Sequence, residues 1–297
     1  MKRWILLFFL GITALGGFAF WPQKQRQELP FISFDLSMSK ANSHFEKCYT
    51  GKKQRHKQWV LFKKLYDQYR HSSYSEKPRI PKIIHQIWLG SPFPQKYLAW
   101  QKSWQEKHPD WEYRLWTDAD AKVFPFINRK RFDEAVNVGE KADIFRYEIL
   151  NQFGGLYVDT DFACVQPFDI FHHTCDFYTG LEAALEENSV VALANGLIGA
   201  APGHPIIKSC IEHISKLSSG KDPGSVLKIS GPGCLKRAFI KCCQKGNYRN
   251  VAFPYTYFYP IPAQHFAKGT KPSDWIQPET YGVHYWETSW ANKGFAE

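Results

Sequence analysis

Residues 154–161 read Gly-Gly-Leu-Tyr-Val-Asp-Thr-Asp, and this stretch decides the fold of the chain. The two glycines end a helical pattern, and residues 156–162 have the composition of a buried strand. Side chains alternate between the faces of a strand, so we expect Tyr157, Asp159 and Asp161 to lie on one face. Two carboxylates so close repel each other unless a cation lies between them. The stretch therefore predicts a strand that ends in Asp159 and Asp161, with Mn²⁺ or Mg²⁺ bound by the two carboxylates. For this motif taken alone, a polar loop without a ligand is the alternative.

The segment directly upstream has apolar residues at helical spacing and predicts a helix over residues 140–153. Asp143 and Arg146 are three residues apart, so they share one face of this helix. A surface ion pair is the alternative, and it would contribute little to stability. The helix is substantially apolar, however, and two glycines join it to the acidic strand. We therefore expect a site in which Asp143 binds sugar hydroxyls and Arg146 binds phosphate or sugar oxygens.

Strand and helix patterns alternate on both sides of this unit. Such alternation predicts an α/β domain with a mostly parallel sheet. The strand patterns cover residues 83–89, 111–116 and 156–162, and the helix patterns cover residues 97–108, 132–138 and 140–153.

The N-terminal residues 4–21 form an uncharged, mostly apolar run that follows two basic residues. The run is at the short end of what crosses a bilayer, and Trp4 and Trp21 stand where interfacial aromatic residues belong. A cleaved signal sequence is the alternative. We therefore expect residues 1–22 to be a membrane anchor or a signal sequence. Basic residues on both sides of the run leave the membrane orientation open.

The rest of the chain divides into two parts. Residues 23–78 are rich in lysine and arginine and contain a helical pattern over residues 58–69, so we expect a basic helical stalk. Residues 79–297 contain the strand and helix alternation, and we expect them to form the functional domain.

Composition excludes some classes of function. The formal net charge of +10 attracts phosphates or anionic lipid, but the chain contains no recognised nucleic-acid module, and we expect no nucleic-acid partner. Seven cysteines include no CxxC pair, which argues against a zinc ribbon or a redox motif. The 11 Trp and 15 Tyr fit a site for sugars or bases, because flat rings pack against both.

Four segments, in this order, resemble the DXD-containing glycosyltransferases of the initiating α-1,6-mannosyltransferase type (glycosyltransferase family 32). More distantly, they resemble the glucosylating domain of large clostridial toxins. Four motifs in order are far more specific than one. The segments are Ile-Pro-Lys-Ile-Ile-His-Gln-Ile-Trp at 80–88, Trp-Thr-Asp at 116–118, Ala-Asp-Ile-Phe-Arg-Tyr at 142–147, and the Gly-Gly to Asp stretch at 154–161.

The resemblance implies a GT-A fold, in which a Rossmann-like mixed sheet flanked by helices carries the D-x-D motif at the end of a strand. It implies a hexosyltransferase that moves mannose, galactose or glucose from GDP-mannose or a UDP-hexose to a glycan or glycolipid, with metal dependence and retention of configuration. Together with the anchor, it implies a single-pass membrane protein, with its catalytic domain in the cytosol of a bacterium or in the Golgi lumen of a eukaryote.

The resemblance also assigns residues. Asp143 and Arg146 would contact the donor sugar and the neighbouring phosphate. Asp159 would contact the sugar or ribose and reach the metal, and Asp161 would be the direct metal ligand. These four residues are the expected catalytic set.

Further residues are expected at the nucleotide-sugar donor. Trp88 would stack on the base, Tyr157 would line the pocket, and Asn195 would bond the transferred sugar. In the C-terminal segment, His284 is a candidate third metal ligand and Trp290 a candidate contact to the leaving group.

Three rival functions remain open at this stage. A phosphohydrolase of the haloacid dehalogenase type also has a D-x-D after a strand, but its motif needs Thr or Val where this chain has Ala163. A sugar-binding protein without catalysis is the second rival. The third is a toxin-like glycosyltransferase that modifies a protein acceptor, which the apolar N-terminal run disfavours.

Overall fold

The computed structural model describes residues 31–41, 53–182, 192–243, 248–263 and 271–287. The expected anchor over residues 1–22 and the candidate donor contact Trp290 lie outside these ranges. Within them, no helix is both long enough and apolar enough to cross a membrane.

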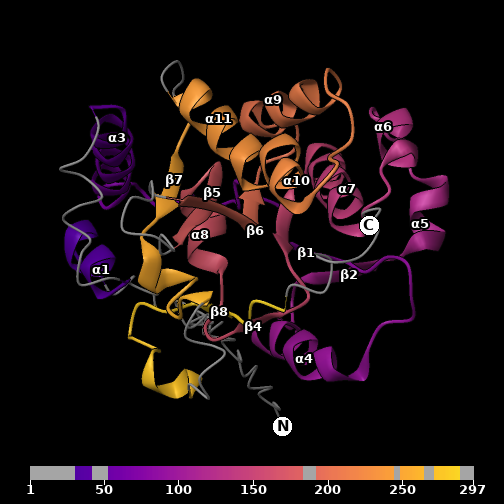
Figure 1. Cartoon of the computed structure of the whole chain (residues 1–297). Coiled ribbons are helices and arrows are strands. Elements are labelled where there is room, and N and C mark those ends of the chain that lie inside the picture. Colours follow the sequence, from indigo (N-terminus) through magenta and orange to yellow (C-terminus); the bar gives the residue numbers. More distant parts are fainter. Residues whose placement is uncertain (1–30, 42–52, 183–191, 244–247, 264–270, 288–297) are drawn as a thin grey trace, which may run out of the picture.

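A six-stranded sheet in the order β2-β1-β3-β6-β5-β7 forms the centre of the fold (Figure 1). Only β6 runs antiparallel to its neighbours, so the expected α/β class with a mostly parallel sheet is confirmed. The strands are β1 (Ile83–Ile87), β2 (Glu112–Trp116), β3 (Gly155–Val158), β5 (Phe177–Glu182), β6 (Ala192–Ala200) and β7 (Asn250–Phe253).

The expected single strand over residues 156–162 is wrong. Strand β3 ends at Val158, and a separate strand, β4 (Phe162–Cys164), pairs with β8 (Gly282–His284) in a small antiparallel sheet. The chain leaves the main sheet after Asp159, whose backbone N–H still donates to the carbonyl of Gly196 at 2.8 Å. The D-x-D motif is therefore the link between two sheets, and both sheets position it.

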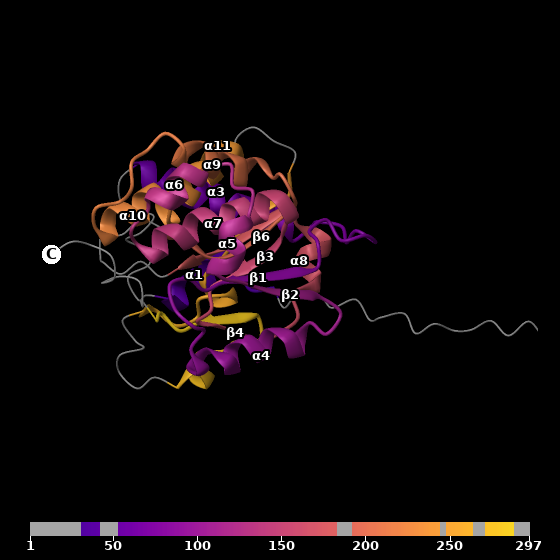
Figure 2. The ribbon, with the colours of Figure 1, turned by 90° about the vertical axis from the view of Figure 1, so that its right-hand side faces the viewer.

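Helices cover the two faces of the main sheet. Figure 2 shows α7, α9 and α11 on one face, and α4 with the small sheet on the other. The helices are α1 (Phe34–Ala41), α3 (Lys53–Tyr69), α4 (Leu98–Lys107), α5 (Asp118–Val123), α6 (Arg129–Glu134), α7 (Val138–Phe153), α8 (Asp169–Thr174), α9 (Pro205–Ile214), α10 (Pro223–Ile229) and α11 (Pro232–Cys243).

The helix expected over residues 132–138 is displaced towards the N-terminus. It is α6, which ends at Glu134, because Asn137 caps the following helix α7. The Asn137 side chain accepts hydrogen bonds from the backbone N–H groups of Gly139 at 2.8 Å and Glu140 at 3.1 Å. A cap of this kind requires a non-helical backbone at Asn137, so one helix cannot run through it.

The described part of the expected stalk contains helices α1 and α3, but it does not stand apart from the domain. Helix α3 lies against β7 at the edge of the sheet (Figure 1). Phe62 is buried against Phe239 of α11, and the Tyr66 hydroxyl is 2.9 Å from that of Tyr257. The apolar face of α3 is thus part of the core, and the opposite face, which carries Lys57 and Lys64, is exposed to solvent.

The direction of the strands determines where a site can form. Strands β1, β3 and β5 point the same way, so their carboxyl ends meet at one edge of the sheet, where the antiparallel β6 begins. Ligands of open α/β sheets bind outside this edge.

Candidate active site

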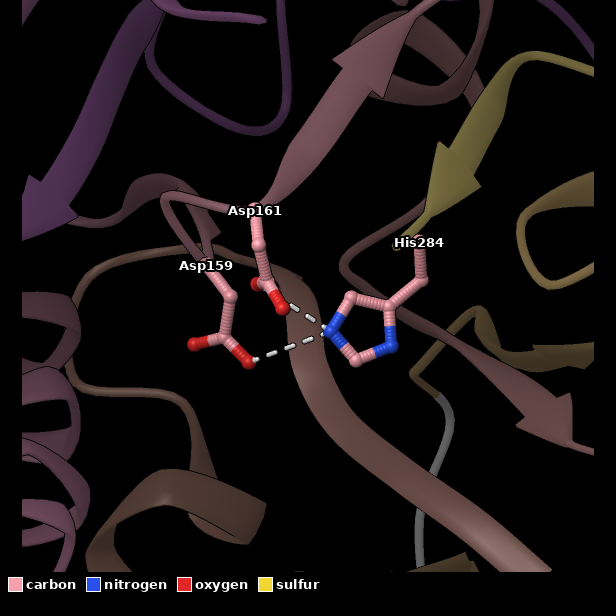
Figure 3. Close-up of side chains that lie close together, drawn as sticks. All are labelled: Asp159, Asp161 and His284. Carbon is pink, nitrogen blue, oxygen red and sulfur yellow. Dashed lines mark hydrogen bonds and ion pairs between the residues drawn. The ribbon is translucent and has the colours of Figure 1, made fainter. Parts of the chain in front are cut away.

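The two aspartates of the D-x-D motif meet His284 at the carboxyl edge of the sheet. His284 Nε2 is 3.2 Å from Asp161 Oδ1 and 4.0 Å from Asp159 Oδ2. Figure 3 shows this ring nitrogen directed at both carboxylates. His284 ends β8, which pairs with β4, so the small sheet brings the C-terminal histidine to the motif. The three ligand candidates named from the sequence therefore lie next to one another in the structure.

The charges of the three groups depend on one another. Burial raises the pKa of Asp159, and Asp161 adds to this effect. Burial also acts to raise the pKa of Asp161, but His284 and the backbone N–H of Glu287 outweigh it and lower that pKa. Burial acts to lower the pKa of His284, but Asp161 and Asp159 outweigh it and raise it. The two carboxylates therefore favour the protonated form of His284, and His284 in turn favours the ionised form of Asp161.

The donor set fits a divalent cation. One ligand atom from each of Asp159, Asp161 and His284 lies within 4.8 Å of the other two, close enough to share one ion. The backbone N–H of Glu287 donates to the other oxygen of Asp161 at 2.7 Å and orients that carboxylate. Oriented carboxylates with one open side are typical of sites that share a cation with substrate phosphates.

A second charged cluster lies beside the motif and is built by helix α7. Arg146 Nη2 is 3.0 Å from Asp143 Oδ1, and Arg146 Nη1 is 3.4 Å from Asp159 Oδ1. The guanidinium also lies 4.4 Å from the centre of the Tyr157 ring. Arg146 is buried, so its pair with Asp143 is not a surface ion pair.

Asp143 has more hydrogen-bond partners than the sequence indicated. It accepts from Asn195 Nδ2 at 2.8 Å and from the Ser230 hydroxyl at 2.9 Å. Burial raises the pKa of Asp143, while Arg146 and these two donors act against that rise. Asn195 is therefore brought to the site, where it holds Asp143 in place.

A cavity of about 470 Å³ opens onto both clusters. Trp88, directly after β1, lines its far end, and the Trp88 Nε1–H donates to Ser91 Oγ at 3.1 Å. Tyr157 lines the same cavity and donates its hydroxyl to Asp159 Oδ1 at 2.6 Å. Every candidate site residue that the structure describes thus borders one cavity.

Three residues that line the cavity were not identified from the sequence. Glu182 ends β5, Tyr259 follows β7, and Gly196 leaves the space beside Asp159. A Cβ atom at position 196 would lie 2.6 Å from Asp159 Oδ2, so any larger residue would require the Asp159 carboxylate to shift. A carboxylate at the end of a strand was a usable signal for Glu182, whereas nothing local marked Tyr259 in its proline-rich segment.

Two family models match adjoining parts of the chain. Residues 94–177 match the glycosyltransferase sugar-binding region containing the DXD motif. Residues 199–296 match the α-1,4-glycosyltransferase conserved region. The first match contains Asp143, Arg146 and the D-x-D motif, and the second contains His284. Both matches support a transferase enzyme and disfavour the phosphohydrolase.

Curated relatives include yeast mannosyltransferases. Inositol phosphoceramide mannosyltransferase 3 of Schizosaccharomyces pombe is 34% identical over 52% of this chain and 43% of its own length. The initiation-specific α-1,6-mannosyltransferase of Candida albicans is 24% identical over 54% of this chain and 52% of its own length. The chain thus spans about half the length of these relatives.

Among solved structures, the catalytic domain of α-toxin from Clostridium novyi aligns with 90% of this chain and 92% of that chain, at 10% identity and a TM-score of 0.45. The evidence for the family comes from the two matched regions and the curated relatives. They confirm the resemblance: over these regions the chain is similar to DXD-containing glycosyltransferases.

Proposed function

We propose that the chain is a metal-dependent glycosyltransferase with a GT-A fold, which transfers a hexose from a GDP- or UDP-sugar to a glycan or glycolipid acceptor. The observation that carries the proposal is the convergence of Asp159, Asp161 and His284 at the carboxyl edge of the sheet, inside the cavity that Arg146 also borders. The names of the yeast relatives support mannose as the sugar and an inositol-containing glycolipid as the acceptor.

Different residues of the chain contact different parts of the donor. The indole of Trp88 stacks on the base, and Arg146 binds the sugar or the adjacent phosphate with its planar fork of donors. Asp143 accepts hydrogen bonds from sugar hydroxyls and holds Arg146 in position. Asp159, Asp161 and His284 would hold a divalent cation, which would supply positive charge to stabilise the leaving diphosphate. The mix of two carboxylates and one imidazole suits Mn²⁺ better than Mg²⁺, which prefers oxygen ligands.

The apolar N-terminal run supports association with a membrane as part of the same proposal. An enzyme held at a membrane meets a lipid-linked acceptor at high local concentration, because both are confined to one surface. A purified enzyme that glycosylates only soluble proteins would contradict this acceptor class and favour the toxin-like alternative.

The direct test is release of nucleoside diphosphate by the full chain in detergent, with Mn²⁺ and a panel of GDP- and UDP-sugars. The full chain is needed because α3 contributes buried residues to the core. We expect release from one donor, loss of release when Mn²⁺ is chelated, and loss in Asp161→Asn. The matched control is Asp133→Asn, which changes an exposed aspartate of α6.

Absence of both release and nucleotide-sugar binding by calorimetry would contradict the proposal. Binding without release in the presence of acceptor lipid would instead favour the sugar-binding alternative.

A further inference from the structure

The cavity continues past the proposed donor site towards β5. Along the edge of the sheet, the order of strands places Trp88 after β1, Asp159 after β3, Asn195 on β6 and Glu182 at the end of β5. With the base on Trp88 and the diphosphate at Asp159, the transferred sugar lies towards Asn195. The region around Glu182 is then left for the second substrate.

Tyr259 supplies an unused polar group in this region. Its side chain is 1% exposed, and its hydroxyl has no hydrogen-bond partner among the residues that the structure describes. A buried hydroxyl without a partner is costly, so its retention points to a ligand. Burial raises the pKa of this phenol well above its usual value, so it stays neutral and can donate.

Glycines at positions 180 and 196 leave space for the Tyr259 side chain. A Cβ atom at Gly180 would lie 2.6 Å from Tyr259 Cε2, and one at Gly196 would lie 3.4 Å from its hydroxyl. The same Cβ position at Gly196 is 2.6 Å from Asp159 Oδ2, so the phenol and the aspartate flank one point of β6. Two glycines therefore let the Tyr259 hydroxyl reach the part of the cavity next to the D-x-D motif.

Glu182 is the carboxylate of the same region. It is partly buried, lines the cavity and forms no hydrogen bond or ion pair with the described residues. Burial raises its pKa to about 7, against the lowering effects of His284 and Lys236. The proposed donor and metal contacts do not use this group.

An aromatic wall completes the region. Trp286 lines the cavity, and its ring centre lies 5.9 Å from that of Tyr259 and 4.4 Å from that of His284. Its φ of +55° is rare for a bulky residue and is retained where the surrounding structure holds it. An aromatic wall beside a carboxylate and a hydroxyl is a typical surface for a sugar or polyol ring.

We propose that Glu182 and Tyr259 form the acceptor subsite, which binds and orients the attacking hydroxyl of a sugar or polyol. The proposal rests on the glycosyltransferase function and deepens it. The acceptor O–H donates to the Glu182 carboxylate, and the Tyr259 hydroxyl donates to an oxygen of the same ring. Orienting the attacking oxygen is worth a factor of about 100 in rate, because small misplacements are that costly.

The test measures donor turnover and donor binding separately in the full chain with Mn²⁺. Water is the smallest acceptor and methyl α-mannoside a ring-bearing one, so release of nucleoside diphosphate is followed with each. The variants Glu182→Gln and Tyr259→Phe keep the shape of the side chains. Glu279→Gln is the control, because Glu279 is a buried carboxyl outside the cavity.

We expect release to fall about 100-fold in Glu182→Gln and about tenfold in Tyr259→Phe. The dissociation constants for donor and for Mn²⁺, measured by calorimetry, stay within about twofold of the original chain, which also shows that the variants fold. Glu279→Gln keeps the original rate.

Two outcomes overturn the inference in different ways. If the original chain turns over a donor and Glu182→Gln does so equally well, the acceptor subsite is wrong and the proposed function stands. If the original chain releases no nucleoside diphosphate with either acceptor and calorimetry shows no binding of a nucleotide sugar, the proposed function fails, and the subsite fails with it.

Discussion

Helix α7 contributes to two buried ion pairs that differ in what surrounds them. Near its first turn, Glu140 pairs with Arg131 of α6 at 3.2 Å, and neither side chain borders the cavity. One turn further on, Asp143 pairs with Arg146 at 3.0 Å, and both do.

The remaining partners of each arginine explain the difference. Arg131 also donates to Ser219 Oγ at 2.9 Å and reaches Glu134 at 3.2 Å, so it ties α6 and α7 to the loop after α9. Arg146 instead lies close to Asp159, and Asp159 lines the cavity. Burial of the charges is common to both pairs, so the cavity beside Asp143 and Arg146 is what distinguishes the two.

Replacement of each arginine by methionine separates the two roles. In Arg146→Met, we expect donor turnover to fall about 1,000-fold, because a positioned positive charge next to the diphosphate is lost. Release of nucleoside diphosphate under saturating Mn²⁺ measures the effect. A variant that keeps a tenth or more of the original rate would remove Arg146 from the proposed site.

In Arg131→Met, we expect the free energy of unfolding to fall by about 3 kcal/mol, because Glu140 remains as a buried charge without its cation. Urea unfolding measures this loss. The folded variant should keep its donor dissociation constant within about twofold. If Arg131→Met binds the donor more weakly although it is as fully folded as the original chain, the two ion pairs do not have the separate roles described above.

Glu140→Gln tests the structural pair through pH and carries the smallest expected effect. Burial raises the pKa of Glu140, and the N–H of Gly220 and Arg131 only partly oppose it. The folded state therefore binds this proton more tightly than the unfolded state, so the group adds stability as pH falls through its raised pKa. Between pH 7 and pH 5, the free energy of unfolding measured with urea should rise in the original chain. It should rise less in the variant. An identical pH dependence in both proteins would contradict the pKa direction.

The part of the fold that could be predicted is the part where local pattern and tertiary structure agree. Strands β1 and β2 are short runs bounded by turn residues, and α7 has both a cap and glycines at its end. Motif spacing identified Asp143 and Arg146 because helix periodicity brings residues three apart to one face. The D-x-D motif lies in the link between β3 and β4, so strand periodicity does not account for its geometry.

The missed elements depend on distant contacts. Strand β6 is rich in alanine and glycine, which have low strand propensity, yet a Cβ atom at Gly199 would lie 2.0 Å from the Tyr178 ring. Glycine is required there by a neighbouring strand, and no local pattern shows this. The break after Val158 was missed for a similar reason, since it depends on pairing of Phe162 with His284 across 122 positions.

Direct binding of Mn²⁺ tests the central claim, that Asp159, Asp161 and His284 hold a cation at the edge of the sheet. Calorimetric titration of Mn²⁺ into the full chain with nucleoside diphosphate present should show one site. The affinity should fall at least about 100-fold in Asp161→Asn and about tenfold in His284→Ala, because Asp161 contributes a negatively charged ligand and His284 a neutral one. The control Asp133→Asn should bind as the original chain does. Equal Mn²⁺ affinity in the original chain and Asp161→Asn, or no binding in the original chain, would contradict the account.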